Sequence, residues 1–343
     1  MNYPSREHVL ALIDAGIRAP SADNHHRIGF EPRPDGLSLR ADATSLDCEE
    51  RHRTILTLIS VGAVVENIMI RASALGFAGR VRFPSDWRST TKIADITWTG
   101  TADESDPLSE AIDARHTNRR FFRGHPLDSA ERRLLDDQTA NTRPAELLWF
   151  EGTRRAAVLR LIANAESSRF AHEALHRELF EAIRFDVGWR DTCAEGLPPG
   201  ALEVEPFLRK PFAMLGQWGV MRRLRALGVH RLLGIRAGYL PCRLCHHLCG
   251  ITVTGDPELG APVAGRVLQR FWLEATRLGL ALQPLAAAAV LAWGPEPGLA
   301  TTLRTAWAKI TPGATPLLLF RLGRARAPSV VTNRLPAATY LRA

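Results

Sequence analysis

The chain has 343 residues, of which 45% are apolar and 23% are charged, and its formal net charge is +8. This balance is typical of a globular protein and excludes a largely disordered chain, a collagen-like repeat and a protein with many membrane spans. The first twenty residues lack a basic stretch followed by a long apolar one, so we expect no export signal. Five cysteines without such a signal predict reduced thiols in a cytoplasmic protein.

The first hundred residues predict two helices, a hairpin and two strands. Ser5 is placed to cap a helix with apolar side chains at three- and four-residue spacing, which ends before Pro20. A turn at 34–36 predicts the hairpin. The apolar stretch 55–75 contains too many polar residues for a membrane span, so we expect a buried helix. In residue numbers, that helix is expected at 53–76 and the two strands at 80–83 and 95–99.

A polar connection at 99–110 separates these elements from the second part of the chain. Residues 188–249 contain five prolines and no clear hydrophobic period, so we interpret them as a lid-like insertion. The other expected elements are strands at 147–151, 250–254 and 316–321, and helices at 154–165, 169–185 and 263–279.

Two short segments, 70–81 and 273–285, repeat one pattern. Each runs from an apolar helix through Leu-Gly into a strand, with Gly76 and Gly279 placed to end the helix in a left-handed conformation. The repeat favours a duplication that gave two related α+β halves, the second enlarged by the insertion. Because helix–glycine–strand units are common, unrelated halves are the alternative.

Several well-known site motifs are absent from the sequence. It has no G-x-G-x-x-G, no G-x-x-x-x-G-K-[ST] and no G-x-S-x-G. The densest local cluster is Cys242-x-x-Cys245-His246-His247-x-Cys249, whose ligand types suit zinc. Ligands within eight residues do not easily surround one ion, so we favour reduced thiols and keep a metal-binding accessory protein as an alternative.

Two polar segments are candidates for ligand binding. RHTNRRFF places Arg115, Thr117 and Arg119 close together, and arginine forks bind phosphate well. By composition alone, a solvated basic loop is the better explanation of this segment. SADNHH places Ser21 and Asn24 on a loop after the first helix, which by itself is an ordinary helix exit.

Four segments together resemble the FMN-dependent nitroreductase superfamily. AGIRAPSADNHHRIGF resembles the A-P-S-x-x-N-x-Q-P-W segment of that family, and RHTNRRFF is similar to its R-R-S-x-R-x-F phosphate segment. ATRLGLALQPL resembles the helix-to-proline segment at the flavin ring, and FRLGRA with NRLP resembles the closing strand and its R-L-P. Their order and wide spacing are similar to the Acg-like branch, in which one chain resembles two fused protomers.

The resemblance implies an α+β nitroreductase-like fold with two pseudo-symmetric halves. The halves are expected at 1–110 and 111–343, with 188–249 as the lid and with a monomer or weak homodimer as the assembly. One intact FMN site per chain is expected, built from both halves.

Residue by residue, the resemblance implies three groups of FMN contacts. Arg115, Thr117, Arg119 and, from R-L-P, Arg334 are expected at the phosphate. The remaining expected contacts are Ser21 and Asn24 at the ribityl chain or ring, Pro284 and Leu285 against the ring, and His26 as a candidate proton donor whose alternative role is hydrogen bonding within its loop. The sequence departs from the family pattern at His26-Arg27-Ile28, where the family has Gln-Pro-Trp, and at Thr332, where it has a basic residue.

The implied function is an FMN-dependent oxidoreductase that passes electrons from NADH or NADPH to a small organic acceptor. A flavin-sequestering protein without turnover is the alternative. Hydride transfer through a flavin needs no side-chain acid or base, so no catalytic residue is named. No nucleic-acid or membrane partner is expected.

Overall fold

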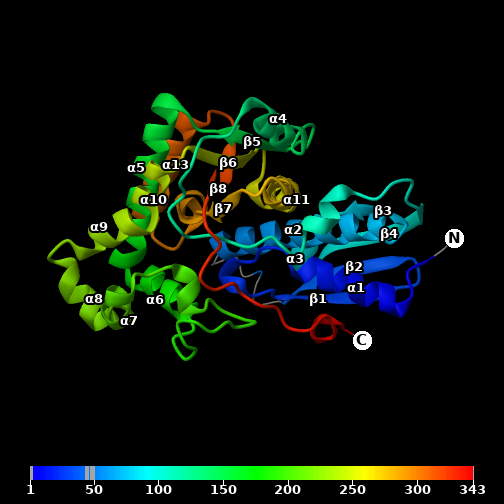
Figure 1. Cartoon of the computed structure of the whole chain (residues 1–343), viewed down its shortest axis with the longest axis horizontal. Helices are drawn as coiled ribbons and strands as arrows, with labels where there is room; N and C mark the ends of the chain where they lie inside the picture. The colour runs from blue at the N-terminus through cyan, green and yellow to red at the C-terminus, as the bar shows by residue number, and fades with distance from the viewer. Residues whose placement is uncertain (1–2, 43–45, 47–50, 343) are drawn as a thin grey trace.

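Two antiparallel four-stranded sheets face each other across a pair of long central helices, α2 (Arg51–Ala74) and α11 (Pro257–Arg277) (Figure 1). The structure is a computed structural model that describes residues 3–42, 46 and 51–342. The predicted free thiol Cys48 lies outside these residues. The expected α+β class is confirmed.

The first sheet has the strand order β1-β2-β4-β3, with every neighbouring pair antiparallel. Helix α1 packs on α2 beside this sheet. The elements of this part are α1 (Arg6–Ile17), a 3-10 turn at Ala22–Asn24, β1 (Ile28–Arg33), β2 (Gly36–Ala41), α2, β3 (Phe77–Arg82), α3 (Trp87–Thr90), β4 (Lys92–Thr101) and a 3-10 turn at Pro107–Ala111.

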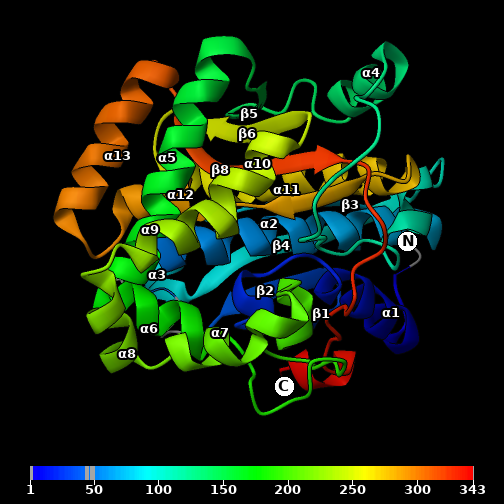
Figure 2. The ribbon, with the colours of Figure 1, turned by 60° about the vertical axis from the view of Figure 1, so that its left-hand side comes forward.

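The second sheet has the order β5-β6-β8-β7, again antiparallel throughout. The helices between β5 and β6 gather at one end of the molecule (Figures 1 and 2). The helices and strands are α4 (Ser129–Asp137), β5 (Ala145–Trp149), α5 (Gly152–Ala171), α6 (Glu173–Glu181), α7 (Arg209–Leu215), α8 (Trp218–Arg225), α9 (Val229–Gly234), α10 (Leu240–Leu244), β6 (His247–Val253), α11, β7 (Ala281–Pro284), α12 (Ala287–Val290), α13 (Pro297–Ile310) and β8 (Thr315–Gly323).

The two sheets share one topology, because in each the long helix follows the second strand and the fourth strand lies between the second and third. The short sequence repeat has a structural counterpart, since Gly76 and Gly279 both adopt the left-handed conformation at the helix ends (φ 81° and 67°). The same offset of 203 residues relates Gly62 of α2 to Gly265 of α11. A duplication, with a boundary near residue 110, stays a prediction.

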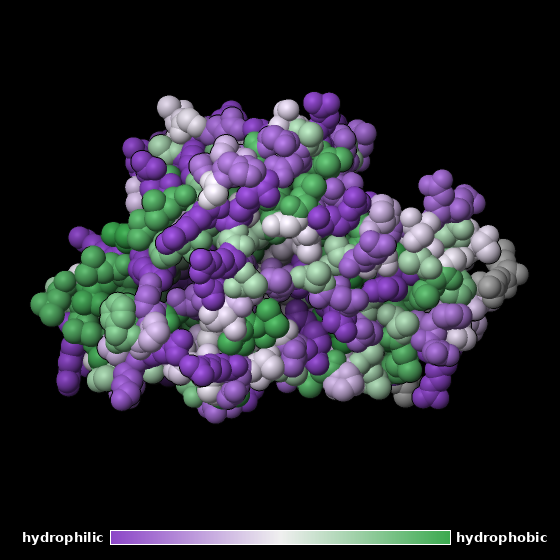
Figure 3. All heavy atoms as spheres, in the orientation of Figure 1, coloured by the Kyte–Doolittle hydropathy of each residue, from purple (hydrophilic) through white to green (hydrophobic). Residues whose placement is uncertain are grey.

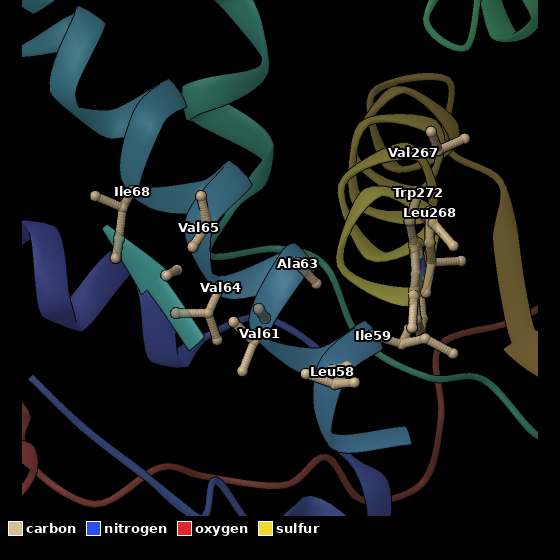
Figure 4. Close-up of a cluster of buried hydrophobic side chains, with 14 of the residues drawn as sticks. Leu58, Ile59, Val61, Ala63, Val64, Val65, Ile68, Val267, Leu268 and Trp272 are labelled. Atoms are coloured by element: carbon tan, nitrogen blue, oxygen red, sulfur yellow. The ribbon is translucent and has the colours of Figure 1, made fainter. Parts of the chain in front are cut away.

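Helices α2 and α11 touch backbone to backbone at these two glycines. A Cβ on Gly62 would overlap the carbonyl oxygen of Pro262, and a Cβ on Gly265 would overlap that of Ile59. Around the crossing, Ile59 points toward Leu268 and Trp272 (Figure 4). Helix α2 is long and apolar enough to cross a membrane by length and composition, but its apolar window is 72% buried inside the protein, as the sequence led us to expect.

Buried polar side chains extend this contact to α1. Gln269 of α11 donates to the Asn67 side-chain oxygen at 2.6 Å, and Asn67 of α2 donates to the Ala15 carbonyl at 2.8 Å. Buried amides of this kind are costly when unpaired, so the pairing fixes the relative position of the three helices.

Two sequence expectations about the second part are wrong in detail. Helix α11 begins six residues before the expected start at 263, because Asp256 caps it and Pro262 is tolerated in the second turn. The segment 188–249 is not irregular throughout, since it contains the helices α7 to α10, and its last three residues belong to β6.

The C-terminal tail runs from β8 back to the first sheet, where Leu341 pairs with Phe30 of β1 (Figure 1). The Arg342 amide donates to the Phe30 carbonyl at 2.9 Å. The tail therefore covers the free edge of β1 and carries Arg334 past the end of α1.

The helix crossing predicts a specific sensitivity. We expect Gly62→Ala and Gly265→Ala each to lower the free energy of unfolding by about 2–3 kcal/mol, because the added methyl meets rigid backbone. Urea unfolding checks this. Gly298→Ala in α13 is the matched control, since its added Cβ would meet nothing within 4 Å and the change is expected to be neutral or slightly stabilising. Equal effects at all three positions would contradict the close crossing.

Candidate functional site

A cavity of about 780 Å³ lies where the first part, the second part and the insertion meet. Its volume is in the range of small-molecule and cofactor sites. Of the nine residues selected from the sequence, all but His26 line it: Ser21, Asn24, Arg115, Thr117, Arg119, Pro284, Leu285 and Arg334. The structure thus brings together segments that are up to 313 positions apart (Ser21 to Arg334).

The end of α1 forms one wall of this cavity. The helix stops at Ile17, two residues before the Ala19-Pro20 bond, and Ser21 follows in an extended conformation. Asn24 then adopts a left-handed conformation (φ 57°), which asparagine tolerates better than most residues. Its side-chain nitrogen donates to the Ala194 carbonyl at 3.2 Å, so this turn is tied to the insertion.

Two arginines converge on the carbonyl groups at the end of α1. Arg115 Nη2 donates to the Arg18 carbonyl at 2.9 Å. Arg334 Nε donates to the Ile17 carbonyl at 2.6 Å and its Nη2 to the Ala19 carbonyl at 2.9 Å. These carbonyls lack helical partners and form the negative end of the α1 dipole, so they favour cations.

The segment that carries Arg115 also runs along β7. Thr117 forms a β-bridge with Leu282, and the Asn118 amide donates to the Leu282 carbonyl at 3.0 Å. Pro284, at the end of the same strand, and Leu285 are thereby placed on the cavity beside the arginine segment. Arg119 reaches the insertion, where its Nη1 donates to the Ala201 carbonyl at 3.2 Å.

The arginines of the cavity have no carboxylate in direct contact, although Asp23 and Glu203 lie close enough to Arg119 to act on its charge. Within the described part of the chain, Arg115, Arg119 and Arg334 form no ion pair, while Asp14 and Asp113 on the cavity wall both pair with Arg18. Burial, together with Arg334, lowers the pKa of Arg115 to about 9, and burial lowers the pKa of Arg119 and of Arg334 to about 10. The cavity therefore favours an anion.

Unpartnered polar atoms lie beside these cations. Nε and Nη1 of Arg115 are buried without a hydrogen-bond partner, and so are Oγ of Ser21 and Oδ1 of Asn24. The Arg115 guanidinium also stacks on the buried Trp272 ring at 4.4 Å, which fixes its plane. Because buried polar groups are rarely left unpaired, this set indicates a polar anionic ligand.

His26 is placed differently from the sequence expectation. It lies away from the main cavity, beside a smaller one of about 210 Å³, and its Nε2 donates to the Ile17 carbonyl at 2.8 Å. Burial, reinforced by Arg334, lowers the pKa of His26 to about 3. This placement does not favour a proton-donor role in the main cavity, because the Nε2–H group is engaged by the Ile17 carbonyl. In this arrangement His26 supports the end of α1.

A histidine–carboxylate pair that no sequence motif indicates lies on the same cavity. His52, at the start of α2, lies 3.1 Å from a Glu178 oxygen of α6, and both side chains line the cavity. Arg53 also approaches Glu178 at 3.4 Å, and hydrogen bonding from His52 helps hold the Glu178 pKa below its usual value. The two residues are 126 positions apart and belong to no local motif, so only the fold brings them together.

The cysteine cluster is buried within the second part. Cys245 Sγ donates to the Cys242 and His247 carbonyls at 3.2 and 3.3 Å, and burial raises the pKa of all three thiols. His246 points elsewhere and contacts the Gly124 carbonyl at 2.9 Å. Among the residues with described positions, no group of three or more His, Cys, Asp or Glu side chains is arranged to hold a metal ion.

Comparison with known proteins gives structural matches only. No family model matches the sequence, and no curated protein matches it. Among solved structures, the chain is similar to the FMN-dependent nitroreductase NfnB from Mycobacterium smegmatis in complex with NADPH (18% identity, 68% of this chain and 92% of that chain, TM-score 0.35). It is also similar to a nitroreductase with bound FMN from Bacteroides fragilis (10%, 67% and 95%, 0.39) and to a nitroreductase-like family protein from Bacillus cereus (13%, 69% and 96%, 0.36).

The position of His26 predicts a pH dependence of stability. Since the folded-state pKa is about 3 and the unfolded value is about 6.5, the unfolded chain takes up a proton as the pH falls below 6.5 and the folded chain does not. Stability is therefore lost on acidification, by about 2 kcal/mol between pH 7.5 and 5 from this residue. Urea unfolding at both pH values should show that His26→Gln removes this loss while His125→Gln, at an exposed site, retains it. A loss of the same size in all three proteins would contradict it.

Proposed function

We propose that the chain binds one FMN in the main cavity and works as an FMN-dependent oxidoreductase that takes electrons from NAD(P)H. The observation that carries the proposal is a set of three arginines on the cavity, Arg115 buried and the other two partly buried, beside unpartnered Ser21 and Asn24 atoms. Within the described residues, none of the three arginines forms an ion pair with a carboxylate. These residues are among the positions that the resemblance to the nitroreductases implies for FMN contacts, and their lining of one cavity supports the proposal. One such donor set faces one cavity among the described residues, which favours a single FMN.

The phosphate would occupy the space beside Arg115, Arg119 and Arg334. A phosphate monoester carries close to two negative charges near neutral pH, and arginine binds it through charge-assisted hydrogen bonds. The α1 carbonyls and the Ala201 carbonyl each engage only one edge of a guanidinium, so further N–H groups of Arg115 stay available. Arg334 Nη1 donates to the Asn333 carbonyl at 3.1 Å and to Thr332 at 3.4 Å, the position where the family has a basic residue.

The flavin ring would lie against Pro284 and Leu285, with Ser21 and Asn24 nearby from the first part of the chain. When bound, FMN would supply hydride acceptance from a nicotinamide and electron delivery to an acceptor. The chain itself would bind, orient and shield the ring from water. Apolar side chains of the insertion, among them Leu208 and Phe212, line the far side of the cavity, so the insertion would form the acceptor-facing wall.

Arg115 offers a test in which stability and binding change in opposite directions. We expect Arg115→Met to weaken FMN binding by about tenfold to a hundredfold, since one charge-assisted contact of roughly 1.5–3 kcal/mol is lost. The same change should leave the ligand-free protein equally or more stable, because it removes a buried unpaired charge. Fluorescence quenching gives the dissociation constants and urea unfolding gives the stability.

Riboflavin is the matched ligand control, because it lacks the phosphate. Its affinity should be nearly the same in wild type and Arg115→Met. Parallel losses for both flavins, together with a destabilised ligand-free protein, would mean that Arg115 supports the fold and does not bind phosphate.

Turnover is tested separately from binding. On anaerobic mixing of the FMN-loaded protein with NADPH or NADH, we expect the oxidised-flavin absorbance to bleach within the stopped-flow time range. A flavin that stays oxidised at saturating nicotinamide would favour the sequestering alternative. A titration that saturates at two equivalent flavins, or at none, would contradict the single site.

A further inference from the structure

The net charge of the chain is concentrated in one segment. Residues 206–255 contain eight basic residues and no acidic residue. The other 36 basic residues balance the 36 acidic residues of the whole chain. A surface with this excess of positive charge attracts anionic partners at distances up to about a Debye length.

The same segment exposes large apolar side chains. Leu227 is 78% exposed, Leu232 66% and Ile235 41%, all on or next to α9. Figure 3 shows hydrophobic atoms gathered at the end of the molecule where α8 and α9 lie, beside strongly hydrophilic ones. On the neighbouring elements, Phe207 is 77% and Met214 58% exposed. We call this combined surface of 206–235 the helical cap.

Exposed basic side chains of the cap lie near these apolar side chains in the sequence. Arg222 and Arg223 lie exposed on α8. Arg231 lies exposed on α9, and the exposed Ile235 follows directly after that helix. Among the residues that the structure describes, none of Lys210, Arg222, Arg223 and Arg231 forms an ion pair with a carboxylate. In contrast, Arg236 at the base of the cap pairs with Glu205 at 2.5 Å.

We propose that the helical cap docks on the surface of an anionic lipid bilayer. Short amphipathic elements with apolar side chains between arginines are suited to the lipid interface, where the apolar groups enter the acyl boundary and the guanidinium groups stay at the phosphates. Each basic residue near such a surface contributes about a fivefold gain in binding. The contact needs no spanning helix, and it departs from the expectation that the protein has no membrane partner.

Two other occupants fit the cap less well. A second copy in a symmetric dimer would bring the unpaired arginines of both caps together, and like charges in contact are unfavourable. A nucleic acid would satisfy the arginines but would leave the protruding Leu227, Leu232 and Phe207 without an apolar environment.

Docking would bring the cavity close to the bilayer. Leu208, Phe212, Leu233 and Arg236 line the cavity and come from the same short helices whose outer faces form the cap. An apolar acceptor dissolved in the lipid would then reach the cavity wall without crossing bulk water. The docking itself does not depend on the identity of the cofactor.

Vesicle co-sedimentation of the full chain tests the proposal. We expect the protein to bind vesicles of phosphatidylcholine with one third phosphatidylglycerol, and to bind pure phosphatidylcholine far more weakly. The double variant Arg222→Gln/Arg223→Gln should lower the partition coefficient roughly thirtyfold, and Leu227→Ser/Leu232→Ser at least tenfold. The matched control is Arg133→Gln/Leu134→Ser on α4, an exposed pair outside the cap, which should bind like wild type.

Each alternative gives a different outcome. Failure to bind anionic vesicles at low salt overturns the proposal, as does equal binding by both cap variants and the wild type. Binding to duplex DNA that needs the arginines but not the leucines identifies a nucleic-acid surface and overturns it. A concentration-dependent dimer that Leu227→Ser/Leu232→Ser abolishes identifies a protein interface and also overturns the proposal. Unchanged urea midpoints show that all variants are folded, and FMN affinity, measured in parallel, is expected to stay unchanged.

Discussion

Backbone meets backbone where α2 crosses α11, because Gly62 and Gly265 present no side chain to each other's helix. This close approach brings the first sheet and the second sheet to opposite sides of one helix pair. The Gln269–Asn67–Ala15 hydrogen bonds then set the position of α1 against the pair. With α1 in place, its C-terminal carbonyls meet Arg115 from one direction and Arg334 of the tail from another, so the geometry of the cavity follows from the crossing.

The arginine cluster of Arg115, Arg119 and Arg334 lowers the stability of the ligand-free protein, because its charges are partly removed from water. The Arg115 guanidinium is buried and those of Arg119 and Arg334 are partly buried, with carbonyl oxygens and an indole ring as their neighbours. Among the described residues, no carboxylate forms an ion pair with any of the three. Buried charges are usually paired, and an unpaired one persists where it has a function. A dianionic phosphate supplies the missing charge and acceptors, so ligand binding would offset a cost that is already built into the fold.

Much of the architecture is accessible from the sequence, because hydrophobic period, capping residues and turn residues act locally. The capped helix after Ser5, the hairpin at 34–36 and the buried helix near 53–76 are all present. Helix α11 begins before Pro262, whereas the sequence predicted a start just after it. A proline in an early turn removes few backbone hydrogen bonds, so the helix capped by Asp256 accommodates it. The helices α7 to α10 are short, and glycine and proline lie within or beside them. Their hydrophobic pattern therefore spans too few residues to indicate a helix from the sequence.

Some residues of the candidate site are predictable from local sequence, and others depend on the fold. Motif resemblance selected eight residues that share the cavity, because each motif is a local string. The ninth residue, His26, lies in the same motif as Ser21 and Asn24, but its ring contacts the Ile17 carbonyl and does not line the cavity. This contact depends on packing. The His52–Glu178 pair and the stack of Arg115 on Trp272 join distant segments, so no window of the sequence contains them. Likewise the absence of acids in 206–255 is visible in the sequence, but the apolar side chains beside the arginines emerge only in the fold.

In the proposed site, Arg115, Arg119 and Arg334 would hold the phosphate of FMN as a dianion. Phosphorus NMR of the FMN-loaded protein, recorded as the pH is lowered from 8 to 5, measures this directly. A phosphate monoester free in water takes up a proton at a pKa of about 6. Beside three arginines that pKa should fall well below its ordinary value, so we expect a bound-phosphate resonance that does not shift across this range. A resonance that titrates near pH 6, as in free FMN, would place the phosphate in solvent and contradict the account.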